Sequence, residues 1–287
     1  MTRACLPFDP ATRRPRIAPP PGAIDCHAHI FGPIDRFPFI SDRSFTPPEA
    51  MVADYLRMLD TLGFERGVIV HGSVHGTDNR PSAAAIAQAP DRLRGVAVID
   101  ASFDDAAIAA LHEQGFRGTR MSTVVRGGPG FGALEAIAGR VKAFSWHLVV
   151  HVNRSSELIE LAPRLLATGL TIVFDHAARI AGSEGIGAPA YRTLLELLAT
   201  DRAWIKLSGL HRMSSGPWPW RDQQRIVEGL IAARLDRLVW GTDWPHPNHF
   251  DLVPNDGDLF DAFCEWVPDA TMRTHILVDN ASALYRF

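Results

Sequence analysis

The chain has 287 residues, of which 46% are hydrophobic and 21% charged, with a formal net charge of −3. This composition is typical of a globular protein with a sizeable core, and the length suits one large domain. The charge excludes a basic surface that would bind nucleic acid or an anionic membrane. No apolar run approaches the ~18 residues of a transmembrane helix. The three cysteines, Cys5, Cys26 and Cys264, are too few and too scattered for a disulfide framework.

The first 22 residues are rich in arginine and proline and lack the apolar stretch of a secretory signal. Because proline blocks helix and sheet hydrogen bonding, residues 1–22 predict an extended arm that lies on the domain, or a disordered tail. We expect the folded domain to span residues 23–287. The few cysteines predict a reducing, cytoplasmic location, and the sequence leaves monomer or homodimer open.

Eight short apolar or β-branched runs follow the arm. They lie at 23–29, 67–72, 94–99, 118–122, 147–152, 171–176, 204–209 and 238–244. Near-continuous apolar character is typical of parallel strands buried on both faces. Between the runs, stretches such as 51–64 and 106–116 repeat apolar residues every three or four positions and predict crossover helices. The sequence therefore predicts a single-domain α/β protein with the (β/α)8 fold of a TIM barrel.

The first run, AIDCHAH, alternates polar and small residues. With a period of two, Asp25, His27 and His29 share one face, and Cys26 lies on the other. Both histidines can then point into the mouth of the barrel. Cys26 is expected to pack as a small apolar residue and not to act as a nucleophile.

Polar side chains end most of the eight runs. They are His27, His29, His71, Arg120, His151, His176, Ser208 and Asp243. The carboxyl ends of the strands form the floor of the active site in a parallel barrel. One histidine at a strand end is usually a hydrogen-bonded structural residue, but a set at successive ends predicts a shared site.

The HxH pair, a histidine ending the sixth run and an aspartate ending the eighth resemble the amidohydrolase superfamily. The segments DCHAHIFGP, HGTDNR, RGTRMSTVVR, FDHAAR and WGTDWPHPN resemble one branch of it, the 2-pyrone-4,6-dicarboxylate lactonases and related sugar-lactone hydrolases. The resemblance extends from Ala23 to Phe287, and WGTDWPHPN is its most specific piece. It implies an enzyme that opens the ring of a carboxylate-bearing lactone.

This resemblance also implies roles for four residues. Asp243 acts as the general base in contact with the water that it activates, and the same carboxyl group returns the proton to the leaving oxygen. His27, His29 and His176 donate hydrogen bonds to the carbonyl as it becomes an oxyanion. One such donor is worth about 3–4 kcal/mol in the transition state.

Arginines near the mouth predict the substrate class, because guanidinium groups bind carboxylates through paired hydrogen bonds. The candidates are Arg120, Arg126 and Arg212, while Lys206 is expected to lie outside the chemistry. Further substrate-binding candidates are His151, His75 and Ser208.

Two positions depart from the pyrone lactonases. Phe45 and His151 stand where those enzymes carry tyrosines that help to bind substrate. A muconolactone or an aldaric lactone is therefore an alternative to the pyrone dicarboxylate.

His151 also raises the question of a metal ion. His27, His29, His151 and Asp243 are the residue types of a zinc site, and many amidohydrolases hold zinc with an equivalent set. The pyrone lactonases work without metal, and Arg120 stands where binuclear relatives carry a bridging lysine. We expect no cofactor, with one zinc ion as the alternative.

Three other functions stay open at this point. The first is a zinc-dependent amidohydrolase or decarboxylase, and the second is a lactone isomerase that uses the same aspartate and histidines without consuming water. The third is a non-catalytic binder of small molecules, which the complete set of histidines, aspartate and arginines disfavours.

Overall fold

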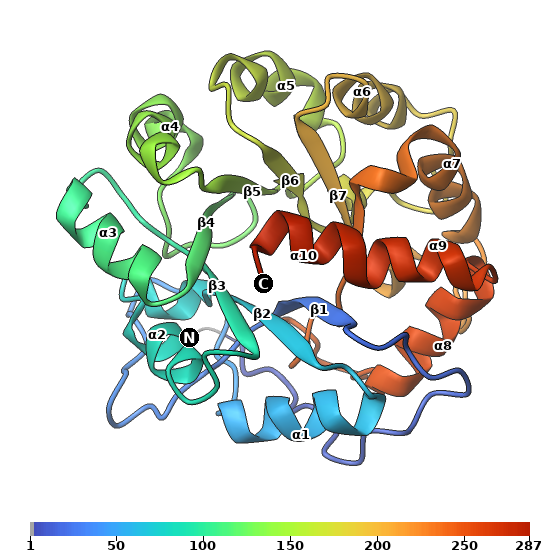
Figure 1. Ribbon diagram of the computed structural model, residues 1–287, viewed down its shortest axis with the longest axis horizontal. Coiled ribbons are helices and arrows are strands. Elements are labelled where there is room, and N and C mark those ends of the chain that lie inside the picture. Colours follow the sequence, from blue (N-terminus) through green and yellow to red (C-terminus); the bar gives the residue numbers. More distant parts are fainter. Residues whose placement is uncertain (1–2) are drawn as a thin grey trace.

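Eight strands follow one another around a barrel in chain order, with helices outside them (Figure 1). In this computed structural model, which describes residues 3–287, each predicted run overlaps one strand. The strands are β1 (Ile24–Ala28), β2 (Arg66–Val70), β3 (Leu93–Ala97), β4 (Phe116–Ser122), β5 (His147–His151), β6 (Ile172–Phe174), β7 (Ala203–Leu207) and β8 (Leu238–Trp240). Neighbouring strands pair in parallel, and Ala28 forms a bridge with Trp244 where β1 meets the segment after β8. The predicted barrel is confirmed.

Helices connect the strands and cover the outside of the barrel (Figure 1). They are α1 (Val52–Leu62), α2 (Arg80–Ile86), α3 (Asp105–Glu113), α4 (Leu134–Val141), α5 (Glu157–Ala167), α6 (Pro189–Leu198), α7 (Gln224–Arg234) and α8 (Asp256–Trp266). The apolar spacing explains their packing: in α1, Val52, Tyr55, Leu59 and Leu62 are buried at intervals of three and four. No helix within residues 3–287 is long and apolar enough to cross a membrane.

The inside of the barrel is filled by apolar side chains at its amino end. Ile24 and Cys26 form this inner cluster together with valines from five other strands. The valines are Val68, Val70, Val96, Val149, Val173 and Val239. Helix α10 (Asn280–Tyr285), after α9 (Ala270–Thr274), crosses the opening and adds Leu284 and Tyr285 (Figure 1). The Tyr285 ring lies 5.1 Å from that of His147, the first residue of β5. The amino end of the barrel is therefore closed.

Strand β1 does not keep the predicted alternation. Its pairing with β2 shifts register between Asp25 and Ala28, so Asp25 does not share a face with His27. The Asp25 carboxylate instead accepts hydrogen bonds from the Tyr55 hydroxyl on α1, at 3.1 Å, and from the Thr242 hydroxyl, at 2.7 Å. Cys26 packs as a small apolar residue, as expected, but it lies inside the barrel and not on the face opposite the histidines; burial there raises the pKa of its thiol.

The described part of the predicted arm, residues 3–22, runs along the barrel beside α8. Arg16 pairs with Asp261 and Glu265 of α8, both at 2.9 Å, and Cys5 N donates to Thr46 O at 2.9 Å.

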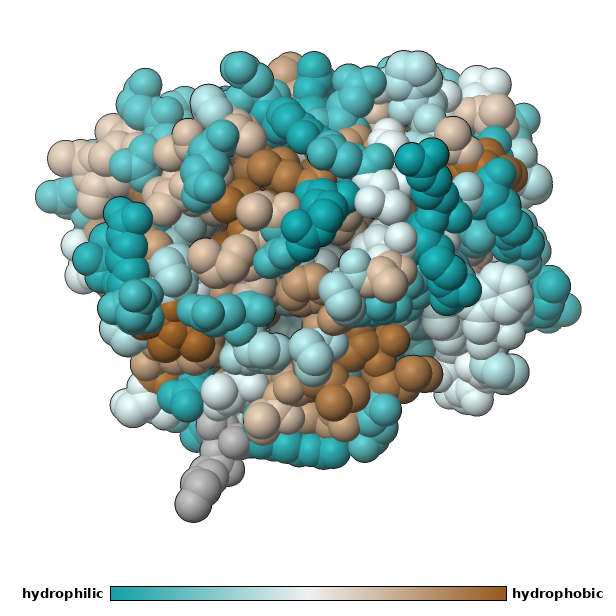
Figure 2. Space-filling view, turned by 90° about the horizontal axis from the view of Figure 1, so that it is seen from below, coloured by the Kyte–Doolittle hydropathy of each residue, from teal (hydrophilic) through white to brown (hydrophobic). Residues whose placement is uncertain are grey.

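The side of the molecule that lies at the bottom of Figure 1 carries hydrophilic groups over much of its surface, with hydrophobic groups in separate patches (Figure 2).

Candidate active site

A cavity of about 380 Å³ opens at the carboxyl end of the barrel, and we call it the mouth cavity. Its polar lining consists of ionisable side chains, together with the neutral Ser44, Ser73 and Asn248; the ionisable ones are His29, Arg120, His151, His176, Arg179, Arg212 and Asp243. Its apolar lining includes Phe31, Phe45, Val124, Val125, Met213 and Pro247. A volume of this order, with converging polar groups on an apolar wall, is typical of a small-molecule site.

Asp243 lies three residues after β8 and is buried, with its backbone in the left-handed region at φ 68°. The Arg212 guanidinium holds its Oδ2 atom through Nε at 2.8 Å and Nη2 at 2.7 Å. Burial raises the pKa of the Asp243 carboxyl, but Arg212 first, and His176 next, hold it well below its ordinary range. The site therefore contains an ionised carboxylate, whose Oδ1 atom faces the two histidines of β1.

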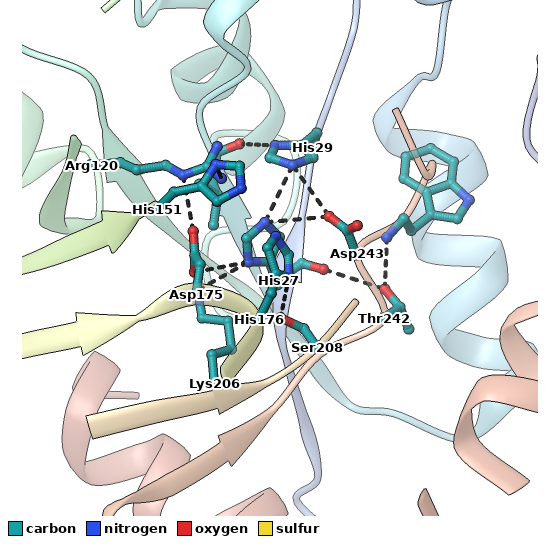
Figure 3. A network of polar contacts seen from close by, with 12 residues as sticks. His27, His29, Arg120, His151, Asp175, His176, Lys206, Ser208, Thr242 and Asp243 are labelled. Carbon is teal, nitrogen blue, oxygen red and sulfur yellow. Dashed lines mark hydrogen bonds and ion pairs between the residues drawn. The ribbon is translucent and has the colours of Figure 1, made fainter. Parts of the chain in front are cut away.

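His27, in β1, and His29, directly after it, come together with their Nε2 atoms 3.3 Å apart (Figure 3). Their distances to Asp243 Oδ1 are 3.5 Å and 3.6 Å, respectively. His29 Nδ1 lies 2.7 Å from Val70 O, and because a carbonyl only accepts, this nitrogen carries the proton. When the His29 ring is neutral, its Nε2 atom therefore presents a lone pair and cannot donate a hydrogen bond to a carbonyl. The predicted role of His29 as an oxyanion donor needs a proton on both ring nitrogens.

His176 sits on a strained turn that follows β6. Four consecutive residues, His176 to Arg179, have φ values between 48° and 57°, a region that costs a non-glycine residue roughly 1–2 kcal/mol. The turn directs both His176 and Arg179 into the mouth cavity. Ser208 Oγ lies 2.9 Å from His176 Nδ1, and a Cβ atom at Gly209 would lie 2.6 Å from the same nitrogen. Ser208 is buried outside the cavity lining and positions His176, whereas the sequence predicted that it contacts substrate.

A buried ionic cluster lies beneath the histidines (Figure 3). Asp175 has its Oδ1 atom 3.0 Å from Lys206 Nζ and its Oδ2 atom 2.9 Å from Arg120 Nε. His27 Nδ1 faces both Lys206 Nζ, at 3.2 Å, and Asp175 Oδ1, at 3.3 Å. Lys206, which the sequence analysis expected to lie outside the chemistry, is therefore placed directly beside His27. A lysine within an apolar strand run needs a buried partner, and that signal could have found Asp175 too.

The predicted arginines take different positions. Arg120 and Arg212 line the mouth cavity, but each already binds a protein carboxylate. Arg126 lies outside the cavity lining, with an exposed side chain that pairs with Asp42 at 3.0 Å. Arg179 was missed, although it lines the cavity and its Nε donates to Asn153 O at 3.0 Å. Its position three residues after His176, in FDHAAR, was the available signal.

The two remaining predicted histidines also separate. His151 lines the mouth cavity and its Nδ1 accepts from Arg120 Nη2 at 2.7 Å, so Nε2 carries the proton of the neutral ring. Within the described residues this Nε2 atom has no partner. His75 is buried behind the cavity wall, with its ring 5.0 Å from that of Phe39 and 6.5 Å from that of Phe31.

The residues of the predicted zinc set fit a metal ion only in part. The Nε2 atoms of His27 and His29 and the Oδ1 atom of Asp243 have the mutual spacing expected around a tetrahedral cation. His151 belongs to neither group of close ligand atoms found among residues 3–287. Two cations also contact this set, Lys206 at His27 and Arg212 at Asp243. Because their charges oppose that of a dication, the set fits a metal ion poorly, and the proposed mechanism uses none.

Comparison with known proteins gives a consistent result. The family profile described as Amidohydrolase matches residues 24–287. The chain is 35% identical over 283 residues to a 2-pyrone-4,6-dicarboxylate hydrolase of Comamonas testosteroni, which covers 95% of this chain and 92% of that protein. It is 34% identical over 272 residues to a 4-sulfomuconolactone hydrolase of Rhizobium radiobacter, and this match covers 93% of this chain and 90% of that protein.

A solved structure is similar over nearly the same length. It is the crystal structure of a probable 2-pyrone-4,6-dicarboxylic acid hydrolase from Acinetobacter baumannii with citric acid bound. The two structures superpose with a TM-score of 0.82 at 30% sequence identity, and the match covers 93% of this chain and 100% of the other.

Proposed function

This chain belongs to the amidohydrolase family, and on that premise we propose that it hydrolyses a small lactone that carries a carboxylate group. The resemblance predicted from the HxH pair and from WGTDWPHPN is thereby confirmed. The observation that carries the proposal is the position of Asp243, whose Oδ1 atom lies 3.5 Å from His27 Nε2 and 3.6 Å from His29 Nε2 beside the mouth cavity.

Asp243 is the proposed general base. A carboxylate with a lowered pKa is a weak base, so it activates only a water molecule that touches it. A lactone is an activated ester, and alignment of the water with the ring carbonyl is sufficient. The water loses its proton to Asp243 as its oxygen bonds to the carbonyl carbon. When the bond to the ring oxygen breaks, Asp243 returns that proton to the leaving oxygen, which yields a hydroxy or keto acid.

Histidines stabilise the oxyanion in this proposal. His176 lines the cavity, and when Ser208 donates to its Nδ1 atom, the proton of the neutral ring lies on Nε2. Burial lowers the pKa of His176 to about 4, so the ring is neutral near pH 7. A neutral donor aimed at the developing charge is worth about 3–4 kcal/mol in the transition state. His27 supplies a second donor when its proton lies on Nε2.

Arg179 and the apolar wall support the substrate class. Arg179 lines the mouth cavity and, within the described residues, forms no ion pair with a carboxylate, so its charge is available to a bound anion. His151 offers an unpartnered Nε2–H nearby. Phe31, Phe45 and Val124 form an apolar wall against which the ring of a flat, unsaturated lactone can pack, such as a pyrone carboxylate or a muconolactone. Ser44, Ser73 and Asn248 also line the cavity and can hydrogen-bond hydroxyls, so an aldaric lactone stays the alternative.

We propose that the reaction needs no cofactor, because Lys206 and Arg212 already contact the residues that would bind zinc. One zinc ion is the alternative.

The two relatives and the solved structure described above are named for lactones that carry carboxylate or sulfonate groups, and the structure from A. baumannii holds citric acid, itself a polycarboxylate. The cytoplasmic location and the monomeric or dimeric state stay predictions.

The test is a turnover assay in water enriched in ¹⁸O. We expect purified protein to open 2-pyrone-4,6-dicarboxylate or a carboxylated muconolactone and to place one ¹⁸O atom in the new carboxylate. An isomeric lactone product without ¹⁸O would favour the isomerase, and no turnover of either lactone would contradict the proposed hydrolase.

A matched pair of variants tests the anion site. Removal of one charge-assisted contact costs about 1.5–3 kcal/mol, so Arg179→Met should raise KM by roughly 10- to 100-fold. Arg126→Met removes an arginine of the exposed surface and should leave KM within about twofold. An equal effect of the two substitutions would contradict the assignment of Arg179.

A further inference from the structure

Lys206 is a fully buried cation in the interior of the barrel, one strand position before Leu207 at the end of β7. Its ammonium group contacts Asp175 Oδ1 at 3.0 Å and His27 Nδ1 at 3.2 Å (Figure 3). Asp175 also binds Arg120, so one buried carboxylate balances two buried cations. The proposed mechanism does not use Lys206, and the charge of Asp175 alone does not explain why a lysine touches a histidine ring.

Hydrogen-bond chemistry decides how that ring is protonated. A lysine ammonium group has three donors and no acceptor. Asp175 Oδ1 also lies near His27 Nδ1, at 3.3 Å, but it already pairs with Lys206 Nζ at 3.0 Å. Because the ammonium group is the nearer neighbour of Nδ1, at 3.2 Å, we assign a lone pair to this nitrogen. A neutral imidazole carries one proton, which must then lie on Nε2. The ring is neutral because a further positive charge beside Lys206 and Arg120 would be unfavourable. Burial first, and Lys206 next, lower the pKa of His27 well below its ordinary value.

We propose that Lys206 fixes His27 in the Nε2–H tautomer, so that a proton, and not a metal ion, lies between His27, His29 and Asp243. His29 presents a lone pair at Nε2, because its Nδ1 atom donates to Val70 O at 2.7 Å. Asp243 Oδ1 is a second acceptor, 3.5 Å from His27 Nε2. The His27 proton is thus shared by two acceptors, and it can turn to the carbonyl of a bound lactone.

The contact between Lys206 and His27 also explains why His27, His29 and Asp243 do not bind a metal ion, although their ligand atoms have a suitable spacing. A cation bound at His27 Nε2 needs the lone pair of that nitrogen, which moves the ring proton to Nδ1. An Nδ1–H group would then face the Lys206 ammonium, donor against donor, and would compete with Lys206 for its only nearby acceptor among the described residues, Asp175 Oδ1. The inference concerns the site of the proposed function, but its tests require no turnover.

The first test uses the unmodified protein. Long-range ¹H–¹⁵N spectra of histidine-labelled protein distinguish protonated from unprotonated ring nitrogens, and the His27→Gln variant identifies the His27 signals. We expect a protonated Nε2 and an unprotonated Nδ1 for His27 at pH 7. A protonated Nδ1 atom, or protons on both nitrogens, would overturn the proposal.

The second test removes the ammonium group. In Lys206→Met the side chain keeps its length, so His27 Nδ1 becomes free to donate to Asp175 and Nε2 becomes a lone pair. After dialysis against zinc and then buffer, we expect about one zinc ion per chain in this variant, and far less than one in wild type and in Lys142→Met, a control at an exposed lysine. Metal content by mass spectrometry is the readout.

Each outcome decides the inference. Zinc bound by wild type and lost in His27→Gln, or a folded Lys206→Met protein that binds none, would overturn it. If Lys206→Met does not fold, the spectra of the unmodified protein decide alone. Absence of lactone turnover would contradict the proposed function and leave the tautomer result unaffected, so the two failures are distinguishable.

Discussion

The two ends of the barrel are built on different principles. At the amino end, Val149, Val173 and Tyr285 pack in a buried apolar cluster that α10 covers (Figure 1). At the carboxyl end, buried histidines, carboxylates and cations face one another, and both His176 and Asp243 have left-handed backbone. The same eight strands carry both arrangements.

This difference indicates a division of labour along the strands. Burial of apolar area stabilises the amino end and the layer beneath the helices, and it offsets the cost of buried charges and backbone strain at the mouth. Substitutions at the amino end should therefore change stability, while substitutions at the mouth should change chemistry. Single substitutions at each end can confirm or contradict this separation.

Tyr285→Ala should produce the largest loss of stability. The side chain is fully buried in the inner cluster, and truncation of a buried aromatic ring costs about 3–5 kcal/mol. The measurement is urea unfolding, and the folded variant should keep a kcat/KM within about threefold of wild type. Tyr285→Phe is the control, because the hydroxyl has no partner within residues 3–287 and its removal should cost little. A large loss of kcat in folded Tyr285→Ala would contradict the separation.

Arg212→Met should change the pH dependence of the chemistry. Burial raises the pKa of Asp243, and Arg212 is the strongest of the charges that lower it. In wild type the base stays ionised well below pH 4, so kcat/KM should not fall between pH 7 and 5 through Asp243. Without Arg212 the folded-state pKa rises, and the acid limb of the profile should move to higher pH. An unchanged acid limb would show that Arg212 does not tune the base.

The stability of the same variant should follow the same linkage. A carboxyl whose folded pKa is lowered contributes stability above its unfolded pKa of about 3.9, and this contribution is lost as the pH falls below that value. Arg212→Met should therefore lose stability at pH 7 and differ less from wild type near pH 3. Arg126→Met, at the surface, should match wild type at both values.

Ser145→Gly should have the smallest effect. Ser145 is exposed, precedes β5 at the amino end and has left-handed backbone at φ 51°. Glycine accepts this conformation without strain, so the substitution should stabilise the protein by about 0.5–1 kcal/mol without a change in activity. Ala110→Gly, within α3, has the opposite expected sign at about 1 kcal/mol. Unfolding curves of the two variants are the check.

The fold could be predicted because its signals are local. Apolar runs such as 147–152 and 171–176 contain their strands, and helical spacing in 51–64 contains α1. The positions of four residues at strand ends also predicted that they are neighbours, and the structure brings them together: His27, His29, His176 and Asp243. A parallel barrel places the carboxyl ends of all its strands at one mouth, so position along a strand was sufficient.

Other features depend on geometry that a sequence pattern does not contain. The register shift in β1 turned Asp25 away from His27, and the loop after β4 carried Arg126 out to pair with Asp42. The left-handed turn after His176 brought in Arg179 instead. Lys206 of β7 meets Asp175, the residue after β6. A buried lysine indicates that a carboxylate partner exists, but spacing in the chain does not say which one.

The most direct test of the account is the turnover of a carboxylated, unsaturated lactone by protein of measured metal content, with Asp243→Asn as the comparison. We expect metal-free wild type to hydrolyse the lactone, and the asparagine variant, which cannot accept a proton, to have kcat lower by roughly 10²- to 10⁴-fold. Activity that requires one equivalent of zinc, or an Asp243→Asn variant as active as wild type, would contradict it.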